Sequence, residues 1–229
     1  MRTTRSNRWL RGVMIGGTVC ATVCLVAGLT ARAGSGPAPG NSDAFGRSLG
    51  QWMLAYTTWY LGSADIPPDG NGNADVGRVV LLPLPNAPGD GTPASIDVTL
   101  GTGQPFTLPF TQWIGNSYID GSEDPVADVS DFRDMQITVK LDGQPIITSK
   151  NVMDYYTEEE FDPPLTTDLP AGIGATAWVF VQSIGIAHPP LTPGQHTLTL
   201  DESISFDDLG FTEPVVYHNT WNITVKAGR

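Results

Sequence analysis

The stretch Met135-Gln-Ile-Thr-Val-Lys-Leu-Asp-Gly-Gln-Pro-Ile-Ile-Thr148 decides the fold class of this chain. Apolar residues at positions 135, 137, 139 and 141 alternate with polar ones, which is the pattern of a strand with one buried and one solvated face. Asp142-Gly143 separates this run from a second one, and both residues tolerate the positive φ angles of a type I′ turn. The stretch therefore predicts a β-hairpin.

Similar short runs recur on both sides of this hairpin. Alternation appears again over 96–100 and 217–225, and further candidate strands span 78–82, 106–110, 176–182, 196–200 and 203–206. Gly, Pro and Asp residues separate these runs, and no helical pattern alternates with them after residue 75. We therefore expect a mainly β protein, a two-sheet antiparallel sandwich. The immunoglobulin-like and jelly-roll arrangements both remain open.

One segment before the strands has helical periodicity. Asp43 is its expected N-cap and Gly62 its expected end. The apolar residues between them recur at spacings of three and four: Leu49, Trp52, Met53, Tyr56, Trp59 and Tyr60. We therefore predict one N-terminal amphipathic helix over 43–62, packed on the sandwich. Such an aromatic stripe is more often core than a ligand platform.

The first 33 residues have the composition of a secretory signal peptide. Residues 1–12 are basic, residues 13–31 carry no charge, and Ala31 and Ala33 place small residues at the cleavage site. An uncleaved anchor is the alternative, because such an uncharged stretch is long enough to cross a bilayer. We expect cleavage, and hence a secreted or periplasmic protein without a membrane attachment. A flexible linker over 34–42 precedes the helix, and a β-sandwich domain spans 63–229.

Charge and cysteine content limit the classes of partner. Five of the 12 basic residues lie in the first 33 positions, which leaves seven basic against 24 acidic residues, a formal net charge of −17 for the remainder. Such a surface repels nucleic-acid phosphates and anionic lipids, so we expect no nucleic-acid partner. Cys20 and Cys24 both lie in the predicted signal peptide. Core burial must therefore hold the mature chain together without disulfides.

Two resemblances to known proteins bear on fold and compartment. The run 191–200 (LTPGQHTLTL) followed by 221–225 (WNITV) resembles the closing strands of extracellular immunoglobulin-like modules. Together with the signal peptide, four stretches resemble a family of exported bacterial proteins of unassigned function: 46–52, 77–85, 150–156 and 217–221. This resemblance implies export and supplies no catalytic residues.

The three histidines do not form a recognisable metal or catalytic motif. The spacing of His188 and His196 is similar to half of a cupin motif, whose other half is absent. By strand parity we expect His196 to face inward and His218 to face away from Trp221. We expect a structural role for each.

Catalysis by a nucleophile or by paired carboxylates has little support in the sequence. There is no Gly-x-Ser-x-Gly motif and no cysteine in the mature chain. The run Glu158-Glu159-Glu160 with Asp162 offers carboxyl groups for glycoside hydrolysis, although a solvated loop is the simpler interpretation. We therefore predict no catalytic residue.

One loop has the spacing of a calcium ligand set. Asp69, Asn71, Asn73 and Asp75 place oxygen-bearing side chains at alternate positions, as a hard cation requires. The missing ligands are expected from the acidic segment 120–131. The alternative is a plain turn, because Asp, Asn and Gly all favour turns. Calcium is the one cofactor that the sequence suggests.

These features favour an acidic, non-catalytic binding or structural module at or outside the cell envelope, with a glycan or protein as its unknown ligand. The alternative is a carbohydrate-active hydrolase on a jelly-roll scaffold. Two carboxylates about 5 to 10 Å apart in a cleft beside exposed aromatic side chains would favour the hydrolase.

The exported protein is expected to begin at Gly34, because Ala31 and Ala33 flank the end of the uncharged run. Mass spectrometry of protein recovered from the periplasm or the medium measures this directly. Recovery of a species that retains Met1 to Ala33 would support the membrane anchor instead.

Overall fold

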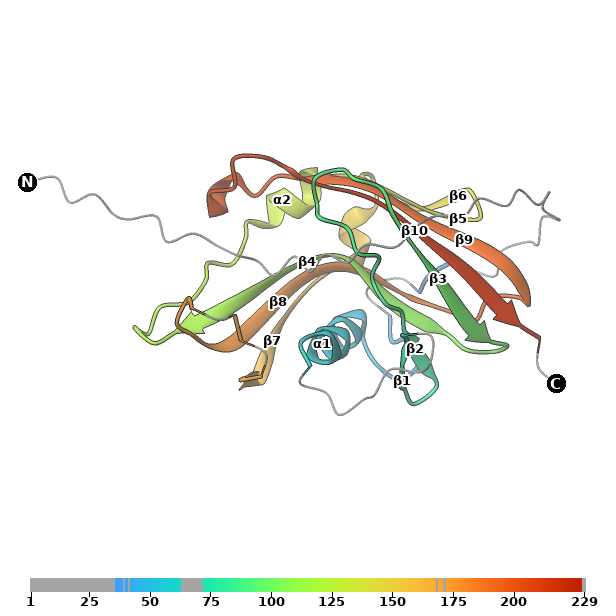
Figure 1. The fold of residues 1–229 in the computed structure, drawn as a ribbon, viewed down its shortest axis with the longest axis horizontal. Coiled ribbons are helices and arrows are strands. Elements are labelled where there is room, and N and C mark those ends of the chain that lie inside the picture. The colour runs from blue at the N-terminus through green and yellow to red at the C-terminus, as the bar shows by residue number, and fades with distance from the viewer. Residues whose placement is uncertain are drawn as a thin grey trace, which may run out of the picture.

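The computed structural model describes residues 36–38, 40, 42–62, 72–167, 169–170 and 172–227. The predicted signal peptide therefore lies outside the described residues. Two five-stranded sheets pack face to face, and a helix, α1 (Leu49–Tyr60), covers the outer face of the first sheet (Figure 1). No helix within the described ranges is both long and apolar enough to cross a membrane.

The first sheet contains, in spatial order, β1 (Ala74–Val76), β2 (Val79–Leu81), β4 (Phe106–Tyr118), β8 (Ala175–His188) and β7 (Tyr156–Leu165). The second contains β3 (Ala94–Gly101), β10 (Val215–Lys226), β9 (Gly194–Ile204), β5 (Gln136–Leu141) and β6 (Gln144–Thr148). Short helices occupy the connections: α2 (Val129–Asp134), η1 (Val152–Tyr155) and η2 (Asp207–Leu209).

The mainly β prediction is confirmed, but the expectation of purely antiparallel sheets is wrong. β3 runs parallel to β10, and β2 runs parallel to β4. The chain changes sheets between β3 and β4, so these consecutive strands do not pair with each other. Each of the two parallel pairs joins strands that are not consecutive in the chain. Alternation of apolar residues gives no strand direction, so the sequence pattern could not reveal this.

The predicted hairpin is present as β5 and β6. Leu141 pairs with Gln144, so the loop has two residues, and their φ angles are 51° at Asp142 and 77° at Gly143. These are the positive angles of a type I′ turn. The apolar positions of β5 are buried, as the alternation predicts.

The helix begins later than the sequence suggests. Ser48, not Asp43, is its N-cap, and it forms a capping box with Gln51. Positive φ angles of 57° at Phe45 and 88° at Gly46 prevent the helix from extending further back. Asp43 therefore lies before a tight turn rather than at the helix start.

Close packing fixes α1 against the first sheet. Met53 is fully buried, and a Cβ atom at Gly185 of β8 would lie only 2.3 Å from its sulfur atom. Glycine at this position therefore allows the helix to approach the sheet. The predicted role of the aromatic stripe is correct for Trp52 and Tyr56, which are buried.

Four buried tryptophans connect the core to the surrounding loops. Each indole N–H donates to a backbone carbonyl: Trp52 to Ala44, Trp113 to Pro125, Trp178 to Thr167 and Trp221 to Pro83. A buried indole needs such a partner, and each bond here also fixes a loop in place.

Replacement of Gly143 by valine is expected to lower the free energy of unfolding by about 1 to 3 kcal/mol, because a β-branched residue is strained at positive φ. Nothing lies within 4 Å of a Cβ at this position, so a steric clash would not explain the loss. Chemical denaturation measures the change. Gly143→Asn is the control and should lose less, since asparagine tolerates this conformation. An unchanged midpoint for the valine variant would contradict the turn.

Candidate functional site

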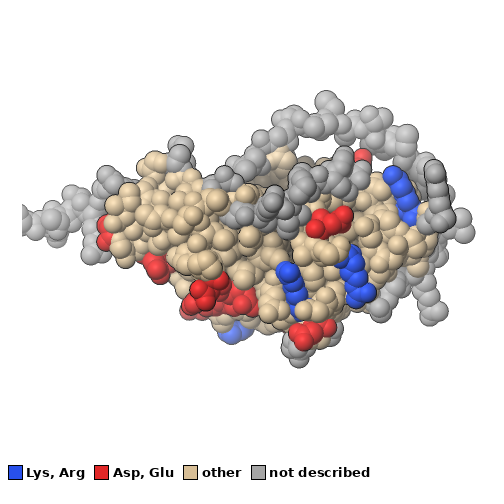
Figure 2. Space-filling view, turned by 90° about the horizontal axis from the view of Figure 1, so that it is seen from below, with Lys and Arg blue, Asp and Glu red and all other residues tan. Residues whose placement is uncertain are grey.

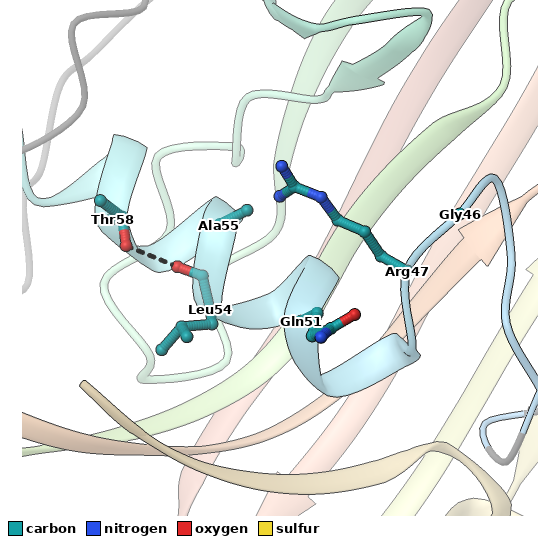
Figure 3. A pocket seen from close by; sticks show the side chains of 6 residues that line it. All are labelled: Gly46, Arg47, Gln51, Leu54, Ala55 and Thr58. Atoms are coloured by element: carbon teal, nitrogen blue, oxygen red, sulfur yellow. Dashed lines mark hydrogen bonds between the residues drawn. The ribbon is translucent and has the colours of Figure 1, made fainter. Parts of the chain in front are cut away.

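Two adjoining hollows open along the outer side of α1. The first, of about 430 Å³, is lined by Gly46, Arg47, Gln51, Leu54, Ala55 and Thr58 (Figure 3). The second, of about 320 Å³, shares Leu54 and Thr58 and continues to residues 161–167 at the end of β7. We call the two hollows together the α1 groove. Its lining is a mixture of aliphatic, hydroxyl and amide groups with one phenyl ring, one guanidinium and one carboxylate.

The acidic run at 158–160 lies in β7, so the expectation of a solvated loop is wrong. Side chains alternate across a strand. Glu159 therefore packs beside Gly50 of α1, whereas Glu158 lies on the opposite face and accepts a hydrogen bond from Tyr156. The run supplies no convergent pair of carboxylates in a cleft. Its charges and the two prolines that follow protect the edge of the sheet from pairing with another strand.

A different pair of carboxyls comes together where α2 meets η2. Asp131 shares a hydrogen bond with Asp208, and burial, that bond and the nearby carboxylates raise the pKa of Asp131 to about 7. The buried Oδ2 of Asp131 accepts no N–H or O–H from any described residue. Two carboxylates can share such a bond only when one holds a proton, and a pKa of about 7 leaves Asp131 partly protonated near neutral pH. Because these residues are distant in sequence, no local pattern could reveal the pair.

His196 takes part in a buried Asp–His pair without a nucleophile. Its Nδ1 lies 2.7 Å from Asp142 Oδ2, and its Nε2 lies 2.9 Å from the carbonyl oxygen of Thr192. In a catalytic triad the second nitrogen would face a hydroxyl or thiol. Here a carbonyl occupies that position. The pair therefore fixes the β5–β6 turn to the start of β9, and His196 faces inward as predicted.

The other two histidines differ in burial. His188 is fully buried and stacks on Phe106, with ring centroids 5.1 Å apart. Its Nδ1 donates to the carbonyl of Pro189 at 2.6 Å, and burial lowers its pKa. His218 is exposed and lies 2.9 Å from Asp201. In the part of the chain that the structure describes, no group of three or more His, Cys, Asp or Glu side chains could hold a metal ion.

The calcium prediction falls largely on residues that the structure does not describe. Asp69 and Asn71 lie outside the described ranges. Asn73 is buried, and its amide donates to the carbonyl of Thr99, whereas Asp75 points to solvent from β1. The expected donor segment 120–131 follows the far end of β4, whose near end pairs with β2. Calcium binding therefore remains a prediction, without support from that segment.

Glu202 of β9 is a carboxyl group buried between the two sheets. Its Oε2 accepts a hydrogen bond of 2.6 Å from Thr111 on β4, and burial raises its pKa to about 7. Its Oε1 has no donor among the described residues. A protonated carboxyl at Oε1 acts as a donor itself, so the neutral acid suits this position better than the anion. The candidate strands 196–200 and 203–206 left Glu202 between them, whereas β9 runs unbroken through it, and no sequence pattern marked this carboxyl as perturbed.

Comparison with known proteins assigns neither a family nor a function to this chain. No protein-family model matches the sequence, and no curated protein matches it significantly. The site must therefore be judged from its own chemistry.

Glu202→Gln is expected to reduce the loss of stability at rising pH. The folded-state pKa of about 7 lies above the ordinary value of 4.5, so stabilisation by the bound proton is fully present below about pH 4.5 and is lost as the pH rises through about 7. At pH 8 this pKa shift gives the neutral Glu202→Gln variant an advantage of about 3 kcal/mol in unfolding free energy over the natural protein. Denaturant unfolding at pH 4.5 and pH 8 measures it.

Asp131→Asn is measured alongside, because its carboxyl titrates in the same range. Each variant alone should remove part of the dependence of the unfolding free energy on pH. An equal loss of stability for Glu202→Gln at both pH values would contradict a protonated Glu202.

Proposed function

We propose that the protein is an exported, acidic, non-catalytic binding module that acts at or outside the cell envelope. One observation supports this proposal. The buried polar side chains link one layer of the fold to another, and they do not line the α1 groove. Glu202 bonds across the sheets to Thr111, and the buried amide of Gln182 both donates to and accepts from the backbone of Ala127. The groove itself offers contacts for binding and no acid–base pair.

We infer that the sandwich is immunoglobulin-like rather than a jelly roll. Immunoglobulin domains place strands B, E and D in one sheet and strands C, F and G in the other. The order β4-β8-β7 matches B-E-D, and β5-β9-β10 matches C-F-G, with β6 as C′. This order agrees with the resemblance of the last strands to extracellular modules. It supports a binding role by analogy of fold alone.

The α1 groove is the proposed binding surface. Gln51 and Thr58 offer hydrogen-bonding groups for hydroxyls, and Leu54, Pro163 and Pro164 offer flat apolar contacts. This combination suits an extended glycan or peptide chain better than a small enclosed ligand.

The alternative hydrolase has one observation in its favour. The pKa of Asp131 is raised to about 7 beside a second carboxyl, as that of a general acid often is. A glycosidase needs its carboxyls about 5 to 10 Å apart, with substrate between them. Asp131 and Asp208 lie in contact with each other, and neither lines the α1 groove, so we favour the binding module.

A binding screen with product analysis tests the proposed function. The exported protein is incubated with cell-wall fractions, envelope polysaccharides and envelope proteins, and every ligand that binds is analysed for cleavage. We expect retention without products, and a loss of retention of about tenfold for Leu54→Asp, which places a charge in the centre of the groove. Thr224→Asp on β10 is the matched control. Released products would support the hydrolase, and binding unaffected by Leu54→Asp would exclude the groove.

A further inference from the structure

Two arginines stack on aromatic rings at the turn before α1. The guanidinium carbon of Arg47 lies 4.9 Å from the ring centroid of Trp52, and that of Arg78 lies 5.5 Å from the ring centroid of Phe45. Both rings belong to one small unit, because Trp52 Nε1 donates to the carbonyl of Ala44 at 2.7 Å. The aromatic faces hold the two cations in place without neutralising them.

Neither arginine forms an ion pair with an acidic residue in the part of the chain that the structure describes. Among the described residues, the ion pairs within 4.0 Å join only histidines to aspartates. This is unexpected in a chain with 24 acidic residues, where a surface guanidinium readily finds a carboxylate. No described residue accepts a hydrogen bond from Arg47 or Arg78 either. Each guanidinium has five N–H donors, so both retain donors for a ligand.

The surroundings of Arg47 leave room for a ligand group. Its side chain runs from the turn along α1 toward Ala55, beside the hollow of about 430 Å³ (Figure 3). The first turn of α1 contains no acidic residue of its own, although the side chain of Glu159 from β7 lies beside Gly50 there. On the face shown in Figure 2, most of the basic side chains lie in the right half, and acidic ones lie among them as well as along the left and lower edges.

We propose that Arg47 and Arg78 form an oxyanion-binding site, which takes a carboxylate or phosphate group of the ligand. This inference deepens the proposed binding function and rests on it. A guanidinium held against a ring exposes its N–H edge, and that edge matches the two oxygens of a carboxylate or phosphate. The excess of acidic residues elsewhere repels anions in general. The site therefore selects ligands that place an anion at this position and offer neutral groups to the rest of the α1 groove.

Titration with small anions tests the site directly. The exported protein, labelled with ¹⁵N, is titrated at low ionic strength with inorganic phosphate, with glucuronate as the carboxylate, and with glucose as the neutral control. We expect saturable shifts of the Trp52 indole signal with one or both anions and none with glucose. Phosphate and glucuronate distinguish the two sources of oxyanion.

Charge-removing variants locate the binding. Arg47→Gln and Arg78→Gln should each weaken anion binding about tenfold or more, because each removes charge-assisted hydrogen bonds. Lys150→Gln, which removes one positive charge at an exposed turn on the second sheet, is the matched control and should leave binding unchanged. Equal weakening by all three variants would show a general charge effect and overturn the site. Absence of saturable shifts would also overturn it.

Failure of this inference is distinguishable from failure of the proposed function. Retention of an envelope polymer that is unchanged in Arg47→Gln would leave the binding module intact and refute the oxyanion site. Anion binding at the two arginines without retention of any polymer or protein would support the site and count against the module.

Discussion

The packing of the first sheet against the second is the constraint on which the rest of this structure depends. Both cysteines lie in the predicted signal peptide, so burial of apolar side chains must supply the stability that disulfides give to many exported domains. Large side chains such as Trp221, Phe106 and Leu108 are fully buried. A polar group enclosed with them is costly without a partner, which explains why so many loops are bonded to the core.

This constraint also explains why two carboxyl groups of this acidic protein have raised pKa values. Most carboxylates lie on the surface, where water screens their repulsion. Glu202 lies between the sheets, and Asp131 is crowded by neighbouring carboxyls, so the charged form of each is disfavoured. Burial is the larger cause in both. These groups couple the packing of the fold to pH without forming a catalytic centre.

The outer face of α1 differs from the core because it is open. The helix is held by its buried face, and Gly185 lets it lie close to the sheet, so its other side remains open. The turn before it forces Arg47 and its neighbours into a fixed arrangement, because Phe45 and Gly46 adopt positive φ angles. A rigid, partly charged surface of this kind loses little entropy when a ligand binds.

The sequence by itself determined most of the strands, the hairpin turn and the helix, because apolar periodicity and the Asp142-Gly143 pair act over a few neighbouring residues. It also placed His196 inward and His218 outward through strand parity. It could not give strand direction, and it placed the helix start at Asp43 and the acidic run in a loop. Only the tertiary structure decided that Asp131 meets Asp208, that Glu202 is enclosed opposite Thr111, and that Arg78 of the β1–β2 turn stacks on Phe45 beside Arg47. These contacts join residues far apart in the chain, and their energies arise from burial and distance, which no local pattern contains.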